Sequence, residues 1–254
     1  MDLHLKGKVV VVTGAAGLKG SIGETIVQAL ANEGAIPVIV CRNDRGFGYE
    51  KELQERGIDA LFVKTDLTDP NQVEAAAKKV GAKYGRIDAL INNIGVNDDF
   101  MWSLKLNLVS FFSMTKYCLP FIKKGNGNIL NIGSKVSLTG QGGTSGYAAS
   151  KGGVLGLTRE WAVDLIKDKI RVNAIIIAES WTPAYDTWIK SLDNGEEKLK
   201  SIVAQIPLEN RMTTPQEIAD TCLFTISDRS SHTTGQFITV DGGYVYLDRS
   251  LLTN

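Results

Sequence analysis

A tyrosine and a lysine four residues apart carry the clearest chemistry in this sequence. Tyr147 and Lys151 open a stretch with helical periodicity, and this spacing places both side chains on one face of a helix. A nearby ammonium group stabilises a phenolate and lowers the pKa of the tyrosine. Such a tyrosine can take a proton from an alcohol or give one to a carbonyl. A surface tyrosine and lysine with no catalytic role is the alternative interpretation.

Two other segments end predicted strands with polar groups. Asn131-Ile132-Gly133-Ser134 places a hydroxyl at the tip of one strand, and Ile91-Asn92-Asn93-Ile94-Gly95 ends the preceding strand in the same way. In open parallel sheets, ligands bind at the carboxyl ends of the strands. This context favours the catalytic interpretation of Tyr147 and Lys151.

A glycine-rich turn follows the first predicted strand. It runs over residues 13–23 and includes Gly14, Gly17 and Gly20. Small residues let the backbone approach a pyrophosphate, and the helix that follows offers unpaired N–H groups and a positive dipole end. The position of the turn, between a buried strand and an amphipathic helix, favours a nucleotide site over an ordinary turn.

The end of the second predicted strand bears on the choice of cofactor. An acidic residue there would hold the ribose 2′-hydroxyl of NAD, and a basic one would accept the 2′-phosphate of NADP. Cys41 occupies this position and Arg42 follows it. Arg42, with Lys19, can form charge-assisted bonds to a phosphate, so NADP is favoured over NAD. A solvated Arg42 is the alternative. Asp66, after the third strand, is a candidate for the adenine amino group.

The elements that must position these residues alternate along the chain. Apolar runs predict strands at residues 9–12, 36–40, 60–64, 87–91, 128–132, 171–177 and 237–240. Helices are expected near 71–84 and 147–165, and a long one is expected to end near 123–124. Pro37 counts against a central position for the second strand. The alternation predicts an α/β protein with a doubly wound, seven-stranded parallel sheet, as one domain over residues 1–254.

Composition narrows the function classes. The 254 residues are 43% hydrophobic and 22% charged, and 28 Lys and Arg balance 28 Asp and Glu. The sequence has no long run of like charge, so a nucleic-acid partner is not expected. It also has no apolar stretch long enough to predict a membrane span. Three scattered Cys and two His argue against a disulfide framework or a metal site. With no signal peptide at the N-terminus, a cytoplasmic enzyme or binding protein with a small-molecule ligand is expected.

Over essentially its whole length, the sequence resembles the short-chain dehydrogenase/reductase family. The matching motifs are the Thr13-Gly14 turn, Asp66, Asn92-Asn93-Ile94-Gly95, Asn107, Ser134, Tyr147 with Lys151, Arg171-Val172-Asn173-Ala174 and Asp241-Gly242-Gly243. The resemblance implies a Rossmann-type fold, an NAD(P)-dependent oxidoreductase activity and a homotetramer.

The resemblance also implies a role for individual residues. Tyr147 would exchange the proton and Ser134 would orient the substrate oxygen. Lys151 would lower the Tyr147 pKa and bind the nicotinamide ribose, and Asn107 would hold a water that relays protons. The implied cofactor-binding residues are Gly14, Gly17, Ser21, Ile22, Arg42, Asp66, Leu67, Asn93, Gly95, Tyr147 and Lys151.

The second half is most similar to the sugar dehydrogenase branch that includes L-fucose dehydrogenases. Residues 140–145, 178–183 and 206–249 carry this similarity, which implies oxidation of an aldose to a lactone. The predicted substrate residues are Ser134, Gln141, Glu179 and Trp181, because sugars favour amide or carboxylate partners and an aromatic face. Alternatively, Trp181 and Trp188 pack a substrate lid, at about 178–210, or a subunit contact.

Two segments depart from the family pattern. The glycine turn is longer by Leu18-Lys19-Gly20, and the Ser21-Ile22 pair after it is similar to enoyl reductases of the same superfamily. The stretch from Gly95 to Asn107 is shorter than usual. The sequence therefore leaves two other functions open: reduction of another ketone or a keto-uronate, and a nucleotide-binding sensor with little turnover.

Overall fold

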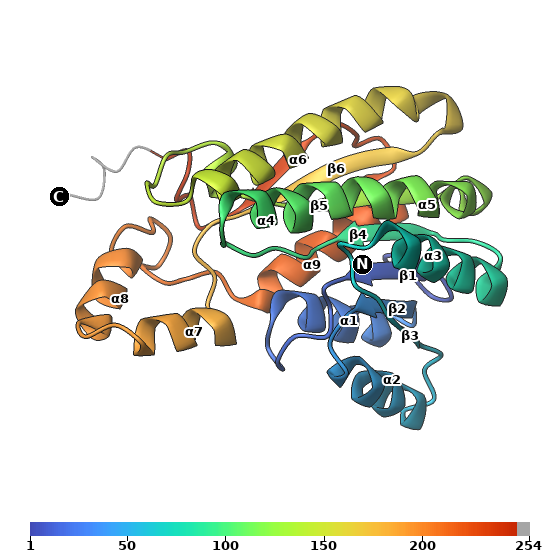
Figure 1. Ribbon diagram of the computed structural model, residues 1–254, viewed down its shortest axis with the longest axis horizontal. Coiled ribbons are helices and arrows are strands. Elements are labelled where there is room, and N and C mark those ends of the chain that lie inside the picture. Colours follow the sequence, from blue (N-terminus) through green and yellow to red (C-terminus); the bar gives the residue numbers. More distant parts are fainter. Residues whose placement is uncertain (248–254) are drawn as a thin grey trace.

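The structure, a computed structural model, describes residues 1–247 (Figure 1). Within them, strands form one parallel sheet in the order β3-β2-β1-β4-β5-β6-β7. They are β1 (Val9–Thr13), β2 (Ile36–Cys41), β3 (Leu61–Lys64), β4 (Ala89–Asn92), β5 (Asn128–Ser134), β6 (Arg171–Ile177) and β7 (Phe237–Val240). The predicted seven-stranded parallel sheet is confirmed. Asp248 and Arg249, which end the sugar-branch stretch, lie outside the described residues.

Helices cover both faces of this sheet. They are α1 (Ile22–Asn32), α2 (Arg45–Glu55), α3 (Pro70–Tyr84), α4 (Phe100–Leu104), α5 (Ser110–Gly125), α6 (Ser145–Asp164), α7 (Pro183–Lys190), α8 (Gly195–Val203) and α9 (Pro215–Ile226). The helices α1, α2 and α9 lie on one face, and α3, α5 and α6 lie on the other. The α7–α8 pair extends beyond the sheet, at the left of Figure 1. No helix within residues 1–247 is long and apolar enough to cross a membrane.

The central strand β1 shows why the core forms on both faces. Its four valines are buried, and successive side chains of a strand point to opposite faces. Val10 and Val12 pack with Ile26 of α1, while Val9 and Val11 pack against the α3 and α5 side. Each such side chain contributes about 1.5–3 kcal/mol when buried. A strand without polar residues therefore requires helices on both sides, which parallel crossovers supply.

Pro37 does not keep β2 at the edge of the sheet, contrary to expectation. β2 lies between β1 and β3, with Pro37 opposite Val10. The Ile36 amide donates to Lys8 on the β1 side, so the missing amide of Pro37 would face β3. Pairing with β3 begins only at Val38. The proline therefore removes no hydrogen bond of the sheet.

The order of the strands changes direction between β1 and β4, because successive strands are added outward from β1 to β3 and then on the other side of β1, from β4 to β7. The carboxyl ends of these two strands separate there and leave a crevice, where such sheets bind their ligands. The turn after β1 and the loops after β4, β5 and β6 meet at this edge.

Candidate active site

The turn between β1 and α1 brings backbone close to the end of β4. Gly14 has a φ of +67°, and a Cβ on it would lie 2.9 Å from the Cα of Ile94. Only glycine fits both constraints. At the end of the turn, Ser21 is the N-cap residue of α1, but its hydroxyl makes no capping bond and is buried without a partner. The α1 N-terminus and this hydroxyl are therefore donors that an anion could use.

Three side chains that the sequence analysis missed support this turn. The Tyr49 hydroxyl donates to the Gly17 carbonyl at 2.7 Å, and Arg45 Nε donates to the same oxygen at 3.3 Å. Glu24, buried in the first turn of α1, accepts from the Gly20 amide at 2.9 Å. Both Arg45 and Tyr49 belong to α2, so only tertiary packing reveals their role.

The inserted residues of the turn extend toward α7. A Cβ on Gly20 would lie 3.9 Å from Cγ of Pro183, the first residue of α7. Lys19 forms an ion pair with Glu52 of α2 at 3.2 Å. The structure therefore directs Lys19 to α2 and does not bring it together with Arg42 as a second phosphate ligand.

Arg42 and Asp66 follow the ends of β2 and β3, close enough for the charge of Arg42 to act on Asp66. Asp66 accepts from the Thr68 amide at 2.9 Å and from its hydroxyl at 2.8 Å. The amide bond is the main cause that lowers the pKa of Asp66, and the charge of Arg42 contributes. Arg42 itself is exposed, and Leu67 is buried. The guanidinium is thus accessible to a ligand at this edge.

Asn93 and Gly95 join the end of β4 to its neighbours. The Asn93 side chain donates to the Thr13 carbonyl at 3.0 Å, and the backbone N–H of Asn93 donates to the Thr13 hydroxyl at 2.9 Å. A Cβ on Gly95 would lie 3.1 Å from Nζ of Lys151. Glycine at this position therefore leaves room for the lysine.

Ser134, Tyr147 and Lys151 meet at the carboxyl end of β5. Ser134 is its last residue, and its hydroxyl lies close enough to that of Tyr147 to lower the tyrosine pKa. Lys151 lies one helical turn after Tyr147 in α6, with Nζ 5.9 Å from the centre of the phenol ring. The ammonium donates to the Ile132 carbonyl at 2.8 Å. The predicted proximity of these three residues agrees with the structure.

The two titratable groups differ from expectation in one respect. Burial raises the pKa of Tyr147, and the hydroxyl of Ser134 only partly offsets this. Burial also lowers the pKa of Lys151 to about 7. The causes of the Tyr147 shift in this structure are burial and Ser134, and the lowering by a protonated Lys151 stays a prediction. The two shifts are opposite in direction and separate the pKa values of two groups whose ordinary values are close, so the free site holds a protonated tyrosine beside a lysine that can be neutral near pH 7.

Asn107 lies within a π-helical turn, Lys105–Val109, between α4 and α5. Its Nδ2 donates to the Val96 carbonyl at 2.7 Å and to the Ser150 hydroxyl at 3.0 Å, and its Oδ1 accepts from the Val96 amide at 2.9 Å. The shortened stretch before it is well packed, since a Cβ on Gly146 of α6 would lie 2.6 Å from Cα of Phe100 in α4. Asn107 therefore ties the loop after β4 to α6, next to Lys151.

The predicted substrate residues lie beyond this centre. Glu179 forms a nearly buried ion pair with Lys135 and accepts from the Tyr185 hydroxyl at 2.8 Å. Trp181 is 39% exposed, and its ring centre is 6.2 Å from that of Tyr185. Gln141 is exposed in the loop after β5, and no hydrogen bond joins it to Glu179 within residues 1–247. Sequence reasoning missed Lys135 and Tyr185.

Buried polar atoms without a partner concentrate at the same edge. Within residues 1–247 these atoms are Ser21 Oγ, Asn92 Oδ1, Ser137 Oγ and Ser180 Oγ. They lie at or just after the carboxyl ends of β1, β4, β5 and β6. Buried polar groups in folded proteins are normally hydrogen-bonded, so these four indicate where a bound molecule or water completes the site.

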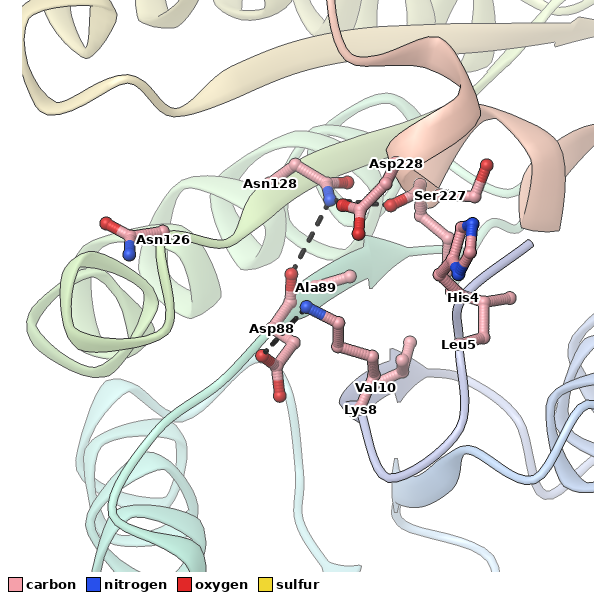
Figure 2. Close-up of a pocket in the computed structure, with 11 residues that line it drawn as sticks. His4, Leu5, Lys8, Val10, Asp88, Ala89, Asn126, Asn128, Ser227 and Asp228 are labelled. Carbon is pink, nitrogen blue, oxygen red and sulfur yellow. Dashed lines mark hydrogen bonds and ion pairs between the residues drawn. The ribbon is translucent and has the colours of Figure 1, made fainter. Parts of the chain in front are cut away.

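A second polar cluster lies at the opposite, amino-terminal ends of the strands (Figure 2). Asp88, just before β4, accepts from the Val9 amide at 2.8 Å and from Arg86 Nε at 3.0 Å, and Lys8 lies 3.8 Å from it. Asn128 of β5 donates to the Ile226 carbonyl at 2.9 Å. The cavity between them is about 20 Å³, which is room for about one water.

Comparison with known proteins supports one family. A family model described as enoyl-(acyl carrier protein) reductase matches residues 14–245. The 3-oxoacyl-(acyl-carrier-protein) reductase of Thermotoga maritima is 36% identical, and the alignment covers 96% of this chain and 100% of the relative. The L-fucose dehydrogenase of Bos taurus is 32% identical, with 96% of this chain and 91% of the relative covered.

Solved structures agree with these relatives. The crystal structure of Cj0485 dehydrogenase is 46% identical with a TM-score of 0.93, and 98% of both chains is covered. L-sorbose reductase from Gluconobacter frateurii, complexed with NADPH and L-sorbose, is 28% identical with a TM-score of 0.89, covering 98% of this chain and 100% of that one.

Proposed function

Because the chain belongs to the short-chain dehydrogenase/reductase family and acts as an NAD(P)-dependent oxidoreductase on CH–OH or carbonyl groups, we propose that its substrate is a neutral sugar or polyol and that it favours NADP. The observation that carries the chemistry is the convergence of Ser134, Tyr147 and the buried Lys151 at the carboxyl end of β5. An aldose such as L-fucose, oxidised at its anomeric hydroxyl to a lactone, is the substrate we favour.

The residues after β1 and β4 fit the proposed dinucleotide. The unpartnered hydroxyl of Ser21 and the α1 N-terminus suit a pyrophosphate, beside the close backbone approach at Gly14. Gly17 and Ile22 would line the same turn. Asp66 with Leu67 would hold the adenine, and Asn93, Gly95, Tyr147 and Lys151 would surround the nicotinamide ribose. When bound, the nicotinamide supplies the hydride acceptor.

The protein side of the reaction is a proton transfer. During oxidation the Tyr147 phenolate would accept the proton of the substrate hydroxyl and become the neutral phenol, and the Ser134 hydroxyl would hold the substrate oxygen in line. Lys151, whose pKa is about 7, is placed to favour the phenolate whenever it is protonated. Asn107, bonded to Val96 and Ser150, would fix the loop through which a water can relay the proton to solvent.

Arg42 is the basis for favouring NADP. It is exposed beside Asp66, at the end of β2 where a 2′-phosphate would lie. Neutral Cys41 precedes it, where an acid would favour NAD. The NADPH in the L-sorbose reductase structure supports this preference by analogy. Arg42→Ala is expected to raise the KM for NADP⁺ about tenfold or more and to change the KM for NAD⁺ little.

The surroundings of Glu179 support a sugar over an apolar ketone. They combine a carboxylate, an ammonium and the exposed ring of Trp181, which suit hydroxyls and the C–H face of a sugar. The named relatives include L-fucose dehydrogenases as well as an acyl-carrier-protein reductase, so reduction of another ketone is the second candidate. A sensor with little turnover is disfavoured, because a pure binder does not need Tyr147 beside Lys151.

The expected homotetramer, cytoplasmic location and single-domain organisation with a lid at about 178–210 stay predictions. An exposed apolar groove between α5 and α6, lined by Val109, Phe112 and Leu157, supports self-association.

Reduced-nicotinamide formation tests the proposal directly. The purified protein is mixed with NAD⁺ or NADP⁺ and a panel of aldoses that includes L-fucose, D-galactose and D-glucose. Turnover with at least one aldose, faster with NADP⁺, is expected. Cofactor binding by calorimetry without turnover of any aldose would contradict the sugar proposal, and absence of cofactor binding would contradict the nucleotide site.

A further inference from the structure

Lys135 and Glu179 form a nearly buried ion pair next to the reacting centre. Their side chains are 12% and 11% exposed. Lys135 directly follows Ser134, and Glu179 lies two residues beyond Ile177, which pairs with Ser134 across β5 and β6. The pair therefore joins the carboxyl end of β5, which carries Ser134, to the carboxyl end of β6.

Two tyrosines from other segments hold this pair in place. The Tyr185 hydroxyl of α7 donates to Glu179 at 2.8 Å, and the ring of Tyr244 lies 4.5 Å from Nζ of Lys135. Burial and the neighbouring carboxylate raise the pKa of Tyr185, so its hydroxyl stays protonated as a donor. Four chain segments thus converge on two charges, at a cost in desolvation that an apolar pair would not carry.

The hydrogen-bonding capacity of the pair is only partly used. A lysine ammonium has three N–H donors, and a carboxylate has about four lone-pair sites. One donor and two lone-pair sites are taken by the bonds between Lys135, Glu179 and Tyr185. The remaining donors and acceptors suit the two hydroxyls of a vicinal diol, each of which both donates and accepts.

We propose that Lys135 and Glu179 are the specificity-determining residues of this site, and that together they bind the vicinal hydroxyls at C2 and C3, which follow the reacting anomeric hydroxyl along the sugar. This inference rests on the sugar function proposed above. Ser134 and Tyr147 would receive the reacting hydroxyl, while the ion pair would receive those at C2 and C3. Charge-assisted bonds in a nearly buried site are strong, and a missing hydroxyl would leave the pair unsatisfied. The site would therefore reject deoxy sugars.

The test compares each aldose with its 2-deoxy analogue. kcat/KM is measured for L-fucose, D-galactose and D-glucose and for their 2-deoxy forms, with wild type and with Lys135→Met/Glu179→Gln. The double variant removes both charges and keeps an acceptor for Tyr185. Wild type is expected to prefer the parent sugar by about 10²-fold, and the double variant by less than about tenfold. Because intrinsic reactivity is the same for both enzymes, the change in this ratio reports recognition.

A matched control removes an ion pair elsewhere. Lys123 and Asp168 lie 2.7 Å apart near the amino-terminal ends of β5 and β6. Lys123→Met/Asp168→Asn is expected to leave the parent-to-deoxy ratio unchanged. If the first double variant does not fold, Tyr185→Phe keeps the pair but removes one support of Glu179, and it should lower the ratio at least threefold while the KM for NADP⁺ stays constant.

The outcomes separate this inference from the proposed function. Turnover of parent and deoxy sugars at similar rates by wild type would overturn the role of the pair and leave the sugar function standing. If the parent-to-deoxy ratio is unchanged in both Lys135→Met/Glu179→Gln and Tyr185→Phe, the role of the pair is likewise overturned and the sugar function stands. Wild type that turns over no aldose would overturn both.

Discussion

Buried charge is present at both ends of the sheet, but it is satisfied at one end and left incomplete at the other. At the amino-terminal end, Asp88 has bonds from the Val9 amide and from Arg86, with Lys8 close by (Figure 2). At the carboxyl end, Lys151 is buried with no carboxylate partner among the described residues. The four unpartnered polar atoms lie at this end as well.

The difference separates stability from function within one fold. A satisfied polar group stabilises the folded state modestly, and an unsatisfied one destabilises it. Natural proteins break local rules mainly where activity requires it. The incomplete end is therefore where substrate and cofactor should bind, and the complete end should only hold strands together. Four substitutions can break or sharpen this comparison.

Tyr147→Phe should have the largest effect. It removes the proton-transferring hydroxyl and keeps the ring, so kcat should fall ~10²–10⁴-fold. Steady-state kinetics with the best aldose would measure this, and calorimetry should give a Kd for NADP⁺ that changes much less than kcat, because the other cofactor-binding residues remain. Retention of most of the activity would show that Tyr147 does not exchange the proton.

Lys151→Met should abolish most activity yet stabilise the protein. In the folded state the lysine pKa is about 7, below its value of about 10.4 in the unfolded chain. Between these values the unfolded state binds one more proton, so this group makes stability rise with pH from about 7 to about 10. The variant should lose that slope and unfold at least ~2 °C higher at pH 7. Urea unfolding across pH 7–10 would test it; a lower Tm with an unchanged slope would contradict the burial argument.

Asp88→Ala should show the reverse pattern at the other end. It leaves the buried Val9 amide without its acceptor, which should cost about 1–3 kcal/mol of unfolding free energy. The kcat should stay within twofold of wild type at a temperature where the variant is folded. Asp88→Asn, which keeps one acceptor, is the matched control and should lose less stability. A large fall in kcat would contradict the assignment of the amino-terminal end of the sheet to stability alone.

Ser21→Ala should have the smallest effect on the free protein. Its hydroxyl has no partner, so unfolding free energy should change by less than about 0.5 kcal/mol. If the hydroxyl binds the pyrophosphate, the Kd for NADP⁺ should rise about tenfold. Calorimetry and thermal unfolding separate these two quantities. An unchanged Kd would remove Ser21 from the nucleotide site.

The sequence was informative where function depends on local pattern. The strand at residues 171–177 and the one at 237–240 were predicted to the residue, because branched apolar runs leave little alternative. Tyr147 and Lys151 were found because one helical turn fixes their separation. The prediction from Pro37 was wrong because the sequence does not reveal which neighbouring strand its missing N–H would have faced.

What depends on tertiary contact was beyond the sequence. Lys135 and Glu179 are 44 residues apart, and nothing local marks either as half of a pair. The support of the glycine turn by Arg45 and Tyr49 comes from a helix whose pattern gave no such signal. The opposite pKa shifts of Tyr147 and Lys151 likewise follow from burial, which spacing alone does not determine.

The π-helical turn at Lys105–Val109 has a consequence for how this protein tolerates deletions. A π turn contains about one residue more than an α turn, so loss of one residue here would leave an unbroken α-helix. The flanking helices α4 and α5 would keep their relative orientation, but the residues of the π turn would lose their present positions. Asn107 would then lose its hydrogen bonds to Val96 and Ser150, although no side chain other than that of the deleted residue is removed. A frame-preserving loss of Leu108 should thus inactivate the enzyme as surely as a substitution of Tyr147, with the catalytic residues all present.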